Sequence, residues 1–330
     1  MEPLVEIQNL VKRFPVEGGF FGGRAGFVHA VNGVSFRIQK GETLGLVGES
    51  GSGKSTLGLL ILRLIDPDSG KISFDGADIT VMSQKALRPL RRQMQVIFQD
   101  PFASLNPRMT VSQIVEEPLI VHHVGTKEER ISHVAELLRL VGLPSDSAGR
   151  YPHEFSGGQR QRIGIARAIA LKPKLVIADE PVSALDVSIR GEIINLLSDL
   201  QEKFGLTYLF ISHDLTIVEH VSSRIAVMYL GKIMEMFPSA LAAEALHPYT
   251  QALISAVPVP DPSVKKSRII LSGDVPSPIN MPGGCPFHPR CKYAQDICRD
   301  REPLFEPYRD GCFAACHFIN DMKPFESGVR

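Results

Sequence analysis

The sequence predicts an α/β protein built on a mainly parallel sheet, followed by an irregular C-terminal segment. Short apolar runs rich in Val and Ile alternate with amphipathic helical patterns through most of the chain. A glycine-rich motif, "GESGSGKST", stands between one such run and the helical pattern that follows it. After about residue 237 prolines become frequent, and every cysteine of the chain lies in this segment.

Buried strands are expected where these apolar runs occur. They are residues 42–48, 94–98, 175–179, 206–212 and 224–230. Helices are expected directly after the glycine-rich motif and between Lys127 and Gly142, where apolar residues fall on one helical face. Strands separated by helices favour parallel pairing with right-handed crossovers. The glycine-rich stretch at 17–26 is expected to be an insertion between two early strands.

Length and charge limit the classes of function. The chain has 330 residues, so we expect more than one part: residues 1–237 as the main domain and 238–330 as an extension, with a helix near Tyr249–Ala256 and then largely irregular chain. Lys plus Arg and Asp plus Glu are both 36, so charge gives no reason to expect a nucleic-acid partner. The most apolar run, 57–65, is far shorter than the ~20 residues a membrane-spanning helix needs, and the N-terminus does not resemble a signal peptide.

The glycine-rich motif has the pattern of a P-loop. Such a loop wraps its backbone amides around phosphate oxygens, its lysine reaches the β- and γ-phosphates, and its serine hydroxyl binds Mg²⁺. In this chain we expect Lys54 and Ser55 to have these two roles. The whole predicted phosphate site consists of Gly48, Glu49, Ser50, Gly51, Ser52, Gly53, Lys54, Ser55 and Thr56. The alternative is a glycine-rich turn, which the strand before and the helix after it disfavour.

An acidic pair ends the apolar run "LVIAD". A carboxylate at this edge of a parallel sheet can bind the hydration shell of Mg²⁺, which we predict for Asp179. Glu180 follows directly, and we predict that it orients and deprotonates the attacking water. Alone, an Asp-Glu pair after a strand is usually a polar turn; beside a P-loop the catalytic interpretation is favoured.

A third motif, "FSGGQRQRIGIARAI", spans Phe155–Ile169. Ser156 has the character of a helix N-cap, and the two glycines after it allow close approach to an anion. The plain alternative is a glycine turn before a basic, solvated helix.

With these motifs the chain resembles the nucleotide-binding subunits of ATP-binding-cassette (ABC) transporters, from about residue 4 to residue 237. The resemblance implies an ABC ATPase fold with a helical subdomain at about 99–160, which docks on the membrane partner. It also implies that Phe14 stacks on adenine, that Gln99 senses Mg²⁺ and the membrane partner, and that His213 is the switch histidine. The signature residues that would contact the γ-phosphate held by the other subunit of a head-to-tail dimer are Ser156, Gly157, Gly158 and Gln159, and Asp186 would link the two sites.

The implied assignments complete the site. We expect Glu180, His213 and Lys54 to be the catalytic residues, and Ser55, Gln99 and Asp179 to be the Mg²⁺ ligands. Phe155 stands where leucine is commoner, and the 18–26 insertion separates Phe14 from the next strand.

Three further stretches resemble one group of these subunits, the oligopeptide, dipeptide and nickel importers. They are "DPFASLNPR", "HPYTQALISAVP" and "GCPFHPRCKYAQDIC". The resemblance implies an ATP hydrolase that drives peptide uptake at the cytoplasmic face of the membrane, paired with a paralogue or a second copy. Its other partners would be two separate permease subunits and, indirectly, an extracytoplasmic binding protein. Nickel or glutathione transport is the alternative. A soluble ABC ATPase of translation or DNA repair is disfavoured, because the chain has one P-loop and no heptad run between Ser55 and Ser156.

The cysteines indicate metal before disulfides, because a reducing compartment keeps thiols free. The spacing of Cys285, Cys291 and Cys298 fits structural zinc poorly and does not match common ferredoxin patterns, so spacing alone leaves the metal open. The resemblance favours a [4Fe–4S] cluster held by these three and Cys316, leaving Cys312 over. Zinc and bare thiols stay as alternatives. A metal module as the main function is disfavoured by the ATPase motifs, which predict ATP and Mg²⁺ as the other cofactors.

Overall fold

The computed structural model describes residues 2–17, 24–258 and 268–325. The chain divides into two compact units, each built from separate stretches of sequence. Unit 1 comprises Met1–Leu4, Ile38–Glu42 and Val81–Ile211, and unit 2 comprises Val5–Arg37, Thr43–Thr80 and Ser212–Arg330. Part of the expected glycine-rich insertion, 18–23, lies outside the described residues.

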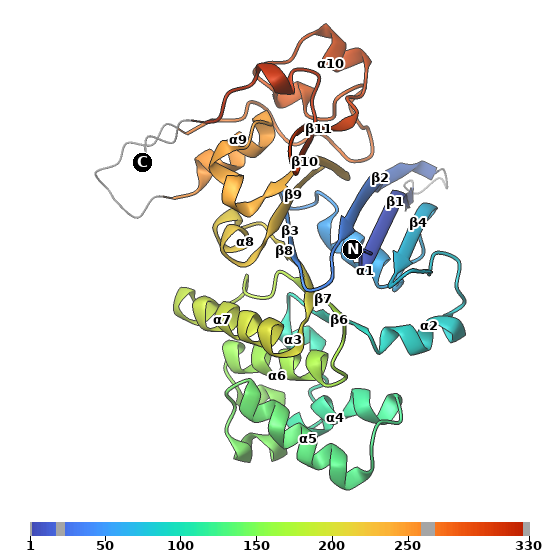
Figure 1. The fold of residues 1–330 in the computed structure, drawn as a ribbon, viewed down its shortest axis with the longest axis vertical. Helices are drawn as coiled ribbons and strands as arrows, with labels where there is room; N and C mark the ends of the chain where they lie inside the picture. The colour runs from blue at the N-terminus through green and yellow to red at the C-terminus, as the bar shows by residue number, and fades with distance from the viewer. Residues whose placement is uncertain (1, 18–23, 259–267, 326–330) are drawn as a thin grey trace. The chain divides into compact units, whose positions relative to one another are not determined.

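Unit 1 contains a parallel sheet and a group of helices (Figure 1). Its strands are β6 (Met94–Ile97), β7 (Leu175–Asp179) and β8 (Thr207–Ser212), and β7 lies between the other two. Every residue of β8 is buried, as expected for a parallel strand covered on both faces. The expected strands at these three places are confirmed.

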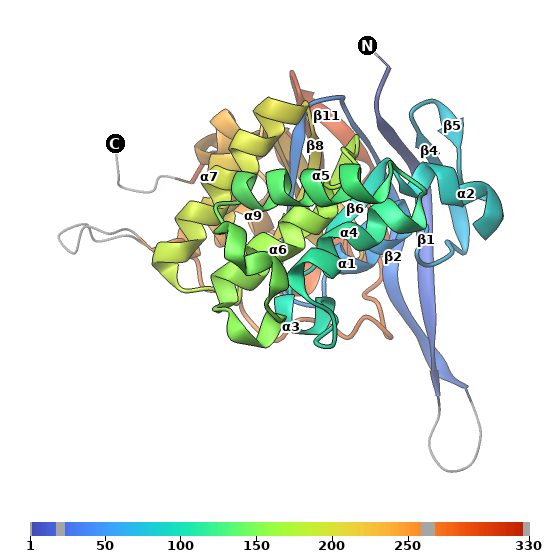
Figure 2. The same cartoon turned by 90° about the horizontal axis from the view of Figure 1, so that it is seen from below.

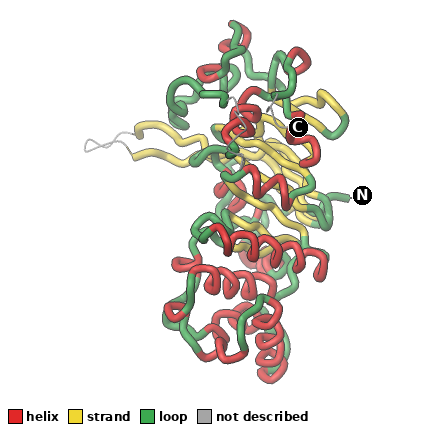
Figure 3. Tube along the Cα trace, turned by 90° about the vertical axis from the view of Figure 1, so that its left-hand side faces the viewer, coloured by secondary structure: helices red, strands yellow, loops and turns green. Residues whose placement is uncertain are grey.

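The helices of unit 1 follow from their sequence patterns and caps. They are α2 (Gln84–Arg91), α3 (Pro101–Ser104), α4 (Val111–Val121), α5 (Lys127–Leu140), α6 (Gly157–Ile169) and α7 (Val187–Phe204), with the 3₁₀ turns η1 (Ser145–Gly149) and η2 (Pro152–Glu154). A capping box starts α4, α5 and α6, where the cap residue and a Gln or Glu three residues later exchange hydrogen bonds. Helix α4 packs against both α5 and α6 (Figure 2), and Figure 3 draws this group as red coils joined by green loops. The range of the predicted helical subdomain, about 99–160, contains α3, α4, α5, the two 3₁₀ turns and the start of α6.

Unit 2 contains two groups of strands. An antiparallel group has the order β2 (Arg24–Ile38), β1 (Val5–Glu17), β4 (Ser69–Phe74), β5 (Ala77–Asp78). In the second group β3 (Thr43–Val47) pairs in parallel with β9 (Arg224–Tyr229), and β10 (Lys232–Pro238) follows β9 antiparallel. Beyond β10 come β12 (Cys312–Ala315) and β11 (Phe305–Arg309), both antiparallel. The fold is thus a mixed α/β fold with mainly parallel strands in both units' central pairings β6–β7–β8 and β3–β9, as expected.

The C-terminal extension is more ordered than expected. Instead of a largely irregular chain, it contributes β11 and β12, which continue from β10. Their sequences, "FEPYR" and "CFAA", lack the continuous Val- and Ile-rich run that identifies the other strands. The helices and 3₁₀ turns of unit 2 are α1 (Lys54–Ile61), α8 (Leu215–Val221), α9 (Pro248–Ala256), α10 (Asp296–Asp300), η3 (Ser239–Glu244), η4 (His288–Arg290) and η5 (Ile319–Asp321).

Across the described parts of the chain, no helix combines the length and the apolar character needed to cross a membrane.

Candidate nucleotide site and cysteine cluster

The P-loop joins β3 to α1 in unit 2. Two of its glycines are required by close backbone contacts. A Cβ at Gly48 would lie 2.1 Å from the carbonyl oxygen of Met228, and one at Gly53, whose φ is 105°, would lie 2.0 Å from that of Ala30. The loop can adopt this curved backbone because glycine has no side chain to collide at these two positions.

Lys54 is held inside this loop. Its Nζ donates hydrogen bonds to the carbonyl oxygens of Gly48, at 2.8 Å, and Glu49, at 2.9 Å. The residue is only 5% exposed. Ser55, one residue further along α1, is exposed. This arrangement places an ammonium group and a hydroxyl at the loop, the two groups that phosphate and Mg²⁺ require.

Unit 1 brings Gln99 and Glu180 together. Gln99 Nε2 donates a hydrogen bond of 2.9 Å to Glu180 Oε2. Glu180 follows Asp179, the last residue of β7, and has a left-handed backbone with φ of 46°. Its amide donates to the carbonyl oxygen of Ile211 at 2.9 Å. A left-handed conformation costs a non-glycine residue on the order of 1–3 kcal/mol, and such residues are enriched at functional sites.

The signature residues begin α6. The Ser156 hydroxyl accepts from the amide of Gln159 at 3.3 Å, and the Gln159 side chain accepts from the amide of Ser156 at 3.0 Å. A Cβ at Gly158 would lie 2.5 Å from Ile189 Cγ2 on α7, so this helix start is packed without room for a side chain.

Three arginines of α6 are structural, which the sequence did not indicate. Arg160 Nε donates to the carbonyl oxygen of Pro152 at 2.7 Å, and its guanidinium lies 3.6 Å from the ring centre of Phe102. Arg162 binds Glu192, and Arg167 donates to the carbonyl oxygen of Ser104 at 2.6 Å. Burial lowers the pKa of Arg167. A basic run suggests a solvated face, whereas these side chains attach α6 to its neighbours.

The remaining predicted residues lie at the starts of helices or on a strand. Asp186 is the N-cap of α7 and is exposed, as is its neighbour Val187, at 81%. His213 follows β8 directly and is exposed.

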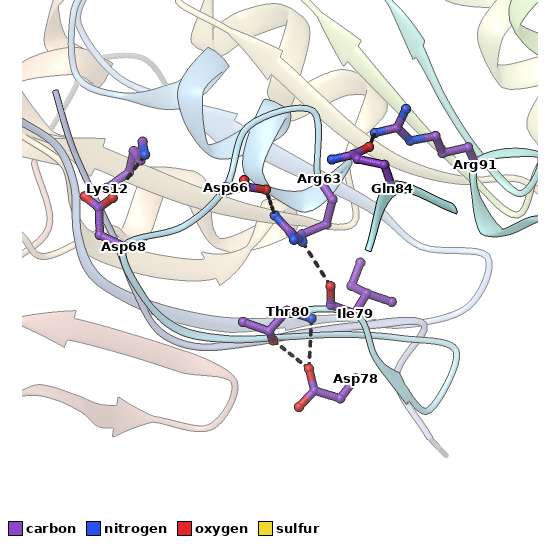
Figure 4. A network of polar contacts seen from close by, with 9 residues as sticks. All are labelled: Lys12, Arg63, Asp66, Asp68, Asp78, Ile79, Thr80, Gln84 and Arg91. Atoms are coloured by element: carbon purple, nitrogen blue, oxygen red, sulfur yellow. Dashed lines mark hydrogen bonds and ion pairs between the residues drawn. The ribbon is translucent and has the colours of Figure 1, made fainter. Parts of the chain in front are cut away.

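Phe14 lies on β1, and the Lys12 ammonium is 5.4 Å from its ring centre. Lys12 forms an ion pair of 3.0 Å with Asp68 (Figure 4). The same view shows Arg63, just after α1, binding Asp66 at 2.5 Å and the carbonyl oxygen of Ile79 at 2.9 Å.

Four of the five cysteines surround one small cavity in unit 2. Cys285, Cys291, Cys298 and Cys316 line it together with aromatic and His side chains, and Cys312 is not among them. Cys312 lies on β12, where its sulfur accepts from Arg309 at 3.7 Å. Burial raises the pKa of Cys285 to about 12 and that of Cys316 to about 11, so these groups are thiols at neutral pH.

The four thiols are a suitable donor set for a [4Fe–4S] cluster, but the cavity that they line is too small to hold one. The cavity has a volume of about 20 Å³, which is enough for about one water molecule. Within the described residues, no group of three or more His, Cys, Asp or Glu side chains is arranged to hold a metal ion. The expected [4Fe–4S] site is not preformed in this structure.

The predicted residues thus fall into two sets. Unit 2 holds Phe14, the P-loop, His213 and the cysteines, and unit 1 holds Gln99, Asp179, Glu180, the signature and Asp186.

Comparison with known proteins agrees with these motifs. The family described as ABC transporter matches residues 31–183, and the one described as oligopeptide/dipeptide transporter, C-terminal region, matches residues 234–298. A relative similar over almost the whole chain is the oligopeptide transport ATP-binding protein AppF of Bacillus subtilis, at 55% identity over 97% of this chain and 98% of that protein. The chain belongs to the ABC transporter family.

Other relatives give the same result for this ABC chain. The probable peptide ABC transporter ATP-binding protein y4tS of Sinorhizobium fredii is 53% identical over 96% of the chain and 90% of its own length. Among solved structures, the dimeric ATP-binding cassette MJ0796 bound to ADP and Pi has a TM-score of 0.64 at 31% identity, covering 71% of this chain and 98% of that one. The ABC family match therefore includes the P-loop, the signature and the acidic pair, while the second match includes three of the cysteines.

Proposed function

We propose that this ABC subunit hydrolyses ATP to drive peptide import through separate membrane permease subunits, at the cytoplasmic face of the membrane. The observation that carries the proposal is similarity along nearly the whole chain, C-terminal segment included, to proteins named for oligopeptide transport. Nickel and glutathione transport are less well supported, because the relatives considered above are named for peptides.

Each site residue has a role in this proposal. The P-loop amides and Lys54 bind the phosphates, and Phe14 stacks on adenine. Ser55, Gln99 and Asp179 would hold Mg²⁺, which neutralises phosphate charge when bound. Water attacks the γ-phosphorus as the bond to the bridging β-γ oxygen breaks. Glu180 accepts the proton of the water, and His213 stabilises the transferring phosphoryl group.

The site would be completed by a second ATPase subunit, a paralogue or another copy of this chain. Its residues 156–159 would contact the γ-phosphate bound by the first subunit, and Asp186 would link the two sites. The dimeric state of the cassette MJ0796 supports this arrangement. The permease pair would dock on the helical subdomain, where Ile120 and Ile131 are 49% and 53% exposed.

A variant at Glu180 tests the catalytic assignment. Glu180→Gln should keep ATP binding and lose turnover, because an amide can hold the water but cannot accept its proton. The measurement compares the variant with the parent for ATP affinity and phosphate release, each reconstituted with its permease in vesicles. Uptake of labelled oligopeptide into the same vesicles tests the substrate class, with nickel and glutathione as competing cargo. ATP hydrolysis at the parental rate in Glu180→Gln would remove Glu180 from the mechanism.

We also propose that the cysteine segment carries a [4Fe–4S] cluster with a structural role, or zinc as the second choice. Four thiols around one cavity support this. Anaerobically purified protein should contain about four irons and four sulfides per chain. Cys316→Ala should lose the iron while Cys312→Ala keeps it. Stoichiometric zinc without sulfide, or protein without metal, would refute the cluster.

A further inference from the structure

The cysteine segment contacts the P-loop through an ion pair within unit 2. Arg290, the last residue of η4, places its Nη1 3.1 Å from Oε1 and 2.9 Å from Oε2 of Glu49. The Arg290 side chain is 9% exposed and that of Glu49 is 26% exposed. A charge-assisted contact that is partly shielded from water is stronger than an ordinary surface ion pair.

A second contact holds the backbone of the same P-loop residue. The amide of Glu49 donates to the hydroxyl oxygen of Tyr249, on α9, at 3.0 Å. Tyr249 is fully buried and packs against Tyr229 and Phe287, with ring centres 4.7 Å and 5.3 Å away. The Arg290 guanidinium lies 5.9 Å from the ring of Tyr229. Tyr249 therefore belongs to an aromatic cluster to which the C-terminal segment contributes Tyr249 and Phe287, and Arg290 lies near its third ring, Tyr229.

Glu49 in turn fixes the phosphate-binding lysine. Its carbonyl oxygen accepts from Lys54 Nζ at 2.9 Å. A displacement of Glu49 would therefore move both the loop amides and the lysine ammonium. Loops that are held in their binding conformation before the ligand arrives bind more tightly, because less ordering remains to be done.

We propose that Arg290 and Tyr249 are positioning residues of the nucleotide site, through which the C-terminal segment sets the affinity for ATP. By holding the side chain and the amide of Glu49, they keep the P-loop and Lys54 in the phosphate-binding conformation. The inference rests on the proposed binding of ATP at the P-loop.

The main variant is Arg290→Gln in the full-length protein, with Arg299→Gln on α10 as the matched control, since Arg299 is exposed in the same segment. The loss of a hydrogen-bonded charge pair should weaken MgATP binding by about tenfold or more. We expect a higher Kd by calorimetry and a higher KM with kcat little changed, whereas a general loss of folded protein would lower kcat alone. Arg290→Lys should recover part of the affinity, and Arg299→Gln should match the parent.

A double-mutant cycle tests whether the effect passes through Glu49. Glu49→Gln should also weaken binding, and adding Arg290→Gln to it should cause little further loss. If Arg290→Gln does not fold, Tyr249→Phe decides, because it keeps the ring packing and removes only the hydroxyl acceptor. An unchanged Kd in a folded Arg290→Gln or Tyr249→Phe protein, while the parent binds ATP, overturns this inference alone. Failure of the parent to bind ATP would overturn the proposed function as well.

Discussion

Gly158 shows how one missing side chain shapes the signature helix. In Gly158→Ala the new methyl group would lie 2.5 Å from Ile189 Cγ2, on a β-branched side chain that has little freedom to move. We expect a loss of about 1–3 kcal/mol in the free energy of unfolding and a fall in ATPase activity. Gly164→Ala on the same helix is the control, because nothing lies within 4 Å of its Cβ position. Urea unfolding and phosphate release of both variants check this, and equal effects would refute it.

Glu235 is a buried carboxylate whose titration should affect stability. It is fully buried, and its Oε1 accepts from the amides of Leu246 and His247 and from the Tyr308 hydroxyl. Burial raises its pKa above the ordinary 4.5, so the folded state holds the proton more tightly than the unfolded state does. The contribution of Glu235 to the free energy of unfolding is then fully present below about pH 4.5 and is lost as the pH rises through the folded-state pKa.

Glu235→Gln should remove this decline, because an amide stays neutral at every pH. Urea midpoints at pH 5 and pH 8 should differ less in this variant than in the parent. Glu306→Gln, an exposed position on β11, should behave as the parent. Identical pH dependence in all three proteins would exclude Glu235 as the cause.

The helix caps allow stability to be separated from activity. Ser156 and Thr126 start α6 and α5 with the same capping box. Ser156→Ala and Thr126→Ala should therefore each cost about 1 kcal/mol in the free energy of unfolding. Only Ser156→Ala should lower ATP turnover in the assembled complex, because Ser156 also belongs to the proposed γ-phosphate contact. A similar loss of turnover in Thr126→Ala would mean that helix stability alone explains the effect.

How far the sequence predicts these elements depends on how local the cause is. The apolar runs of β7 and β8 and the helix α5 follow from residues close in the chain, and their bounds are found within a few residues. The contact of Arg167 with Ser104 and the pairing of β12 with β10 join distant segments, which no local pattern encodes. The P-loop could be read because its chemistry lies in consecutive residues. The role of Arg290 could not be predicted in this way, because its partner Glu49 is 241 residues away in the sequence.

For the whole molecule, the proposed composite sites predict that ATP controls assembly. ATP should convert purified Glu180→Gln from monomer to dimer, since a trapped nucleotide contributes contacts to both subunits. Val187, 81% exposed beside Asp186, would be covered in that dimer, so adding Val187→Asp should prevent it. Light scattering with and without MgATP measures the mass. A chain that binds ATP and stays monomeric would point to a paralogue as the required partner.

The ion pair between Glu49 and Arg290 also implies a delay during synthesis, because its two residues leave the ribosome at different times. At roughly 5–20 residues per second, a ribosome makes Arg290 roughly 12–48 s after Glu49, since 241 residues separate them. During that interval the nascent chain carries a phosphate loop without its final support. Stalled nascent chains that have emerged from the ribosomal tunnel only as far as residue 280 should bind ATP weakly. Chains that have emerged beyond residue 325 should bind it tightly. An incomplete subunit would thus bind nucleotide only weakly until its C-terminal segment has left the ribosome.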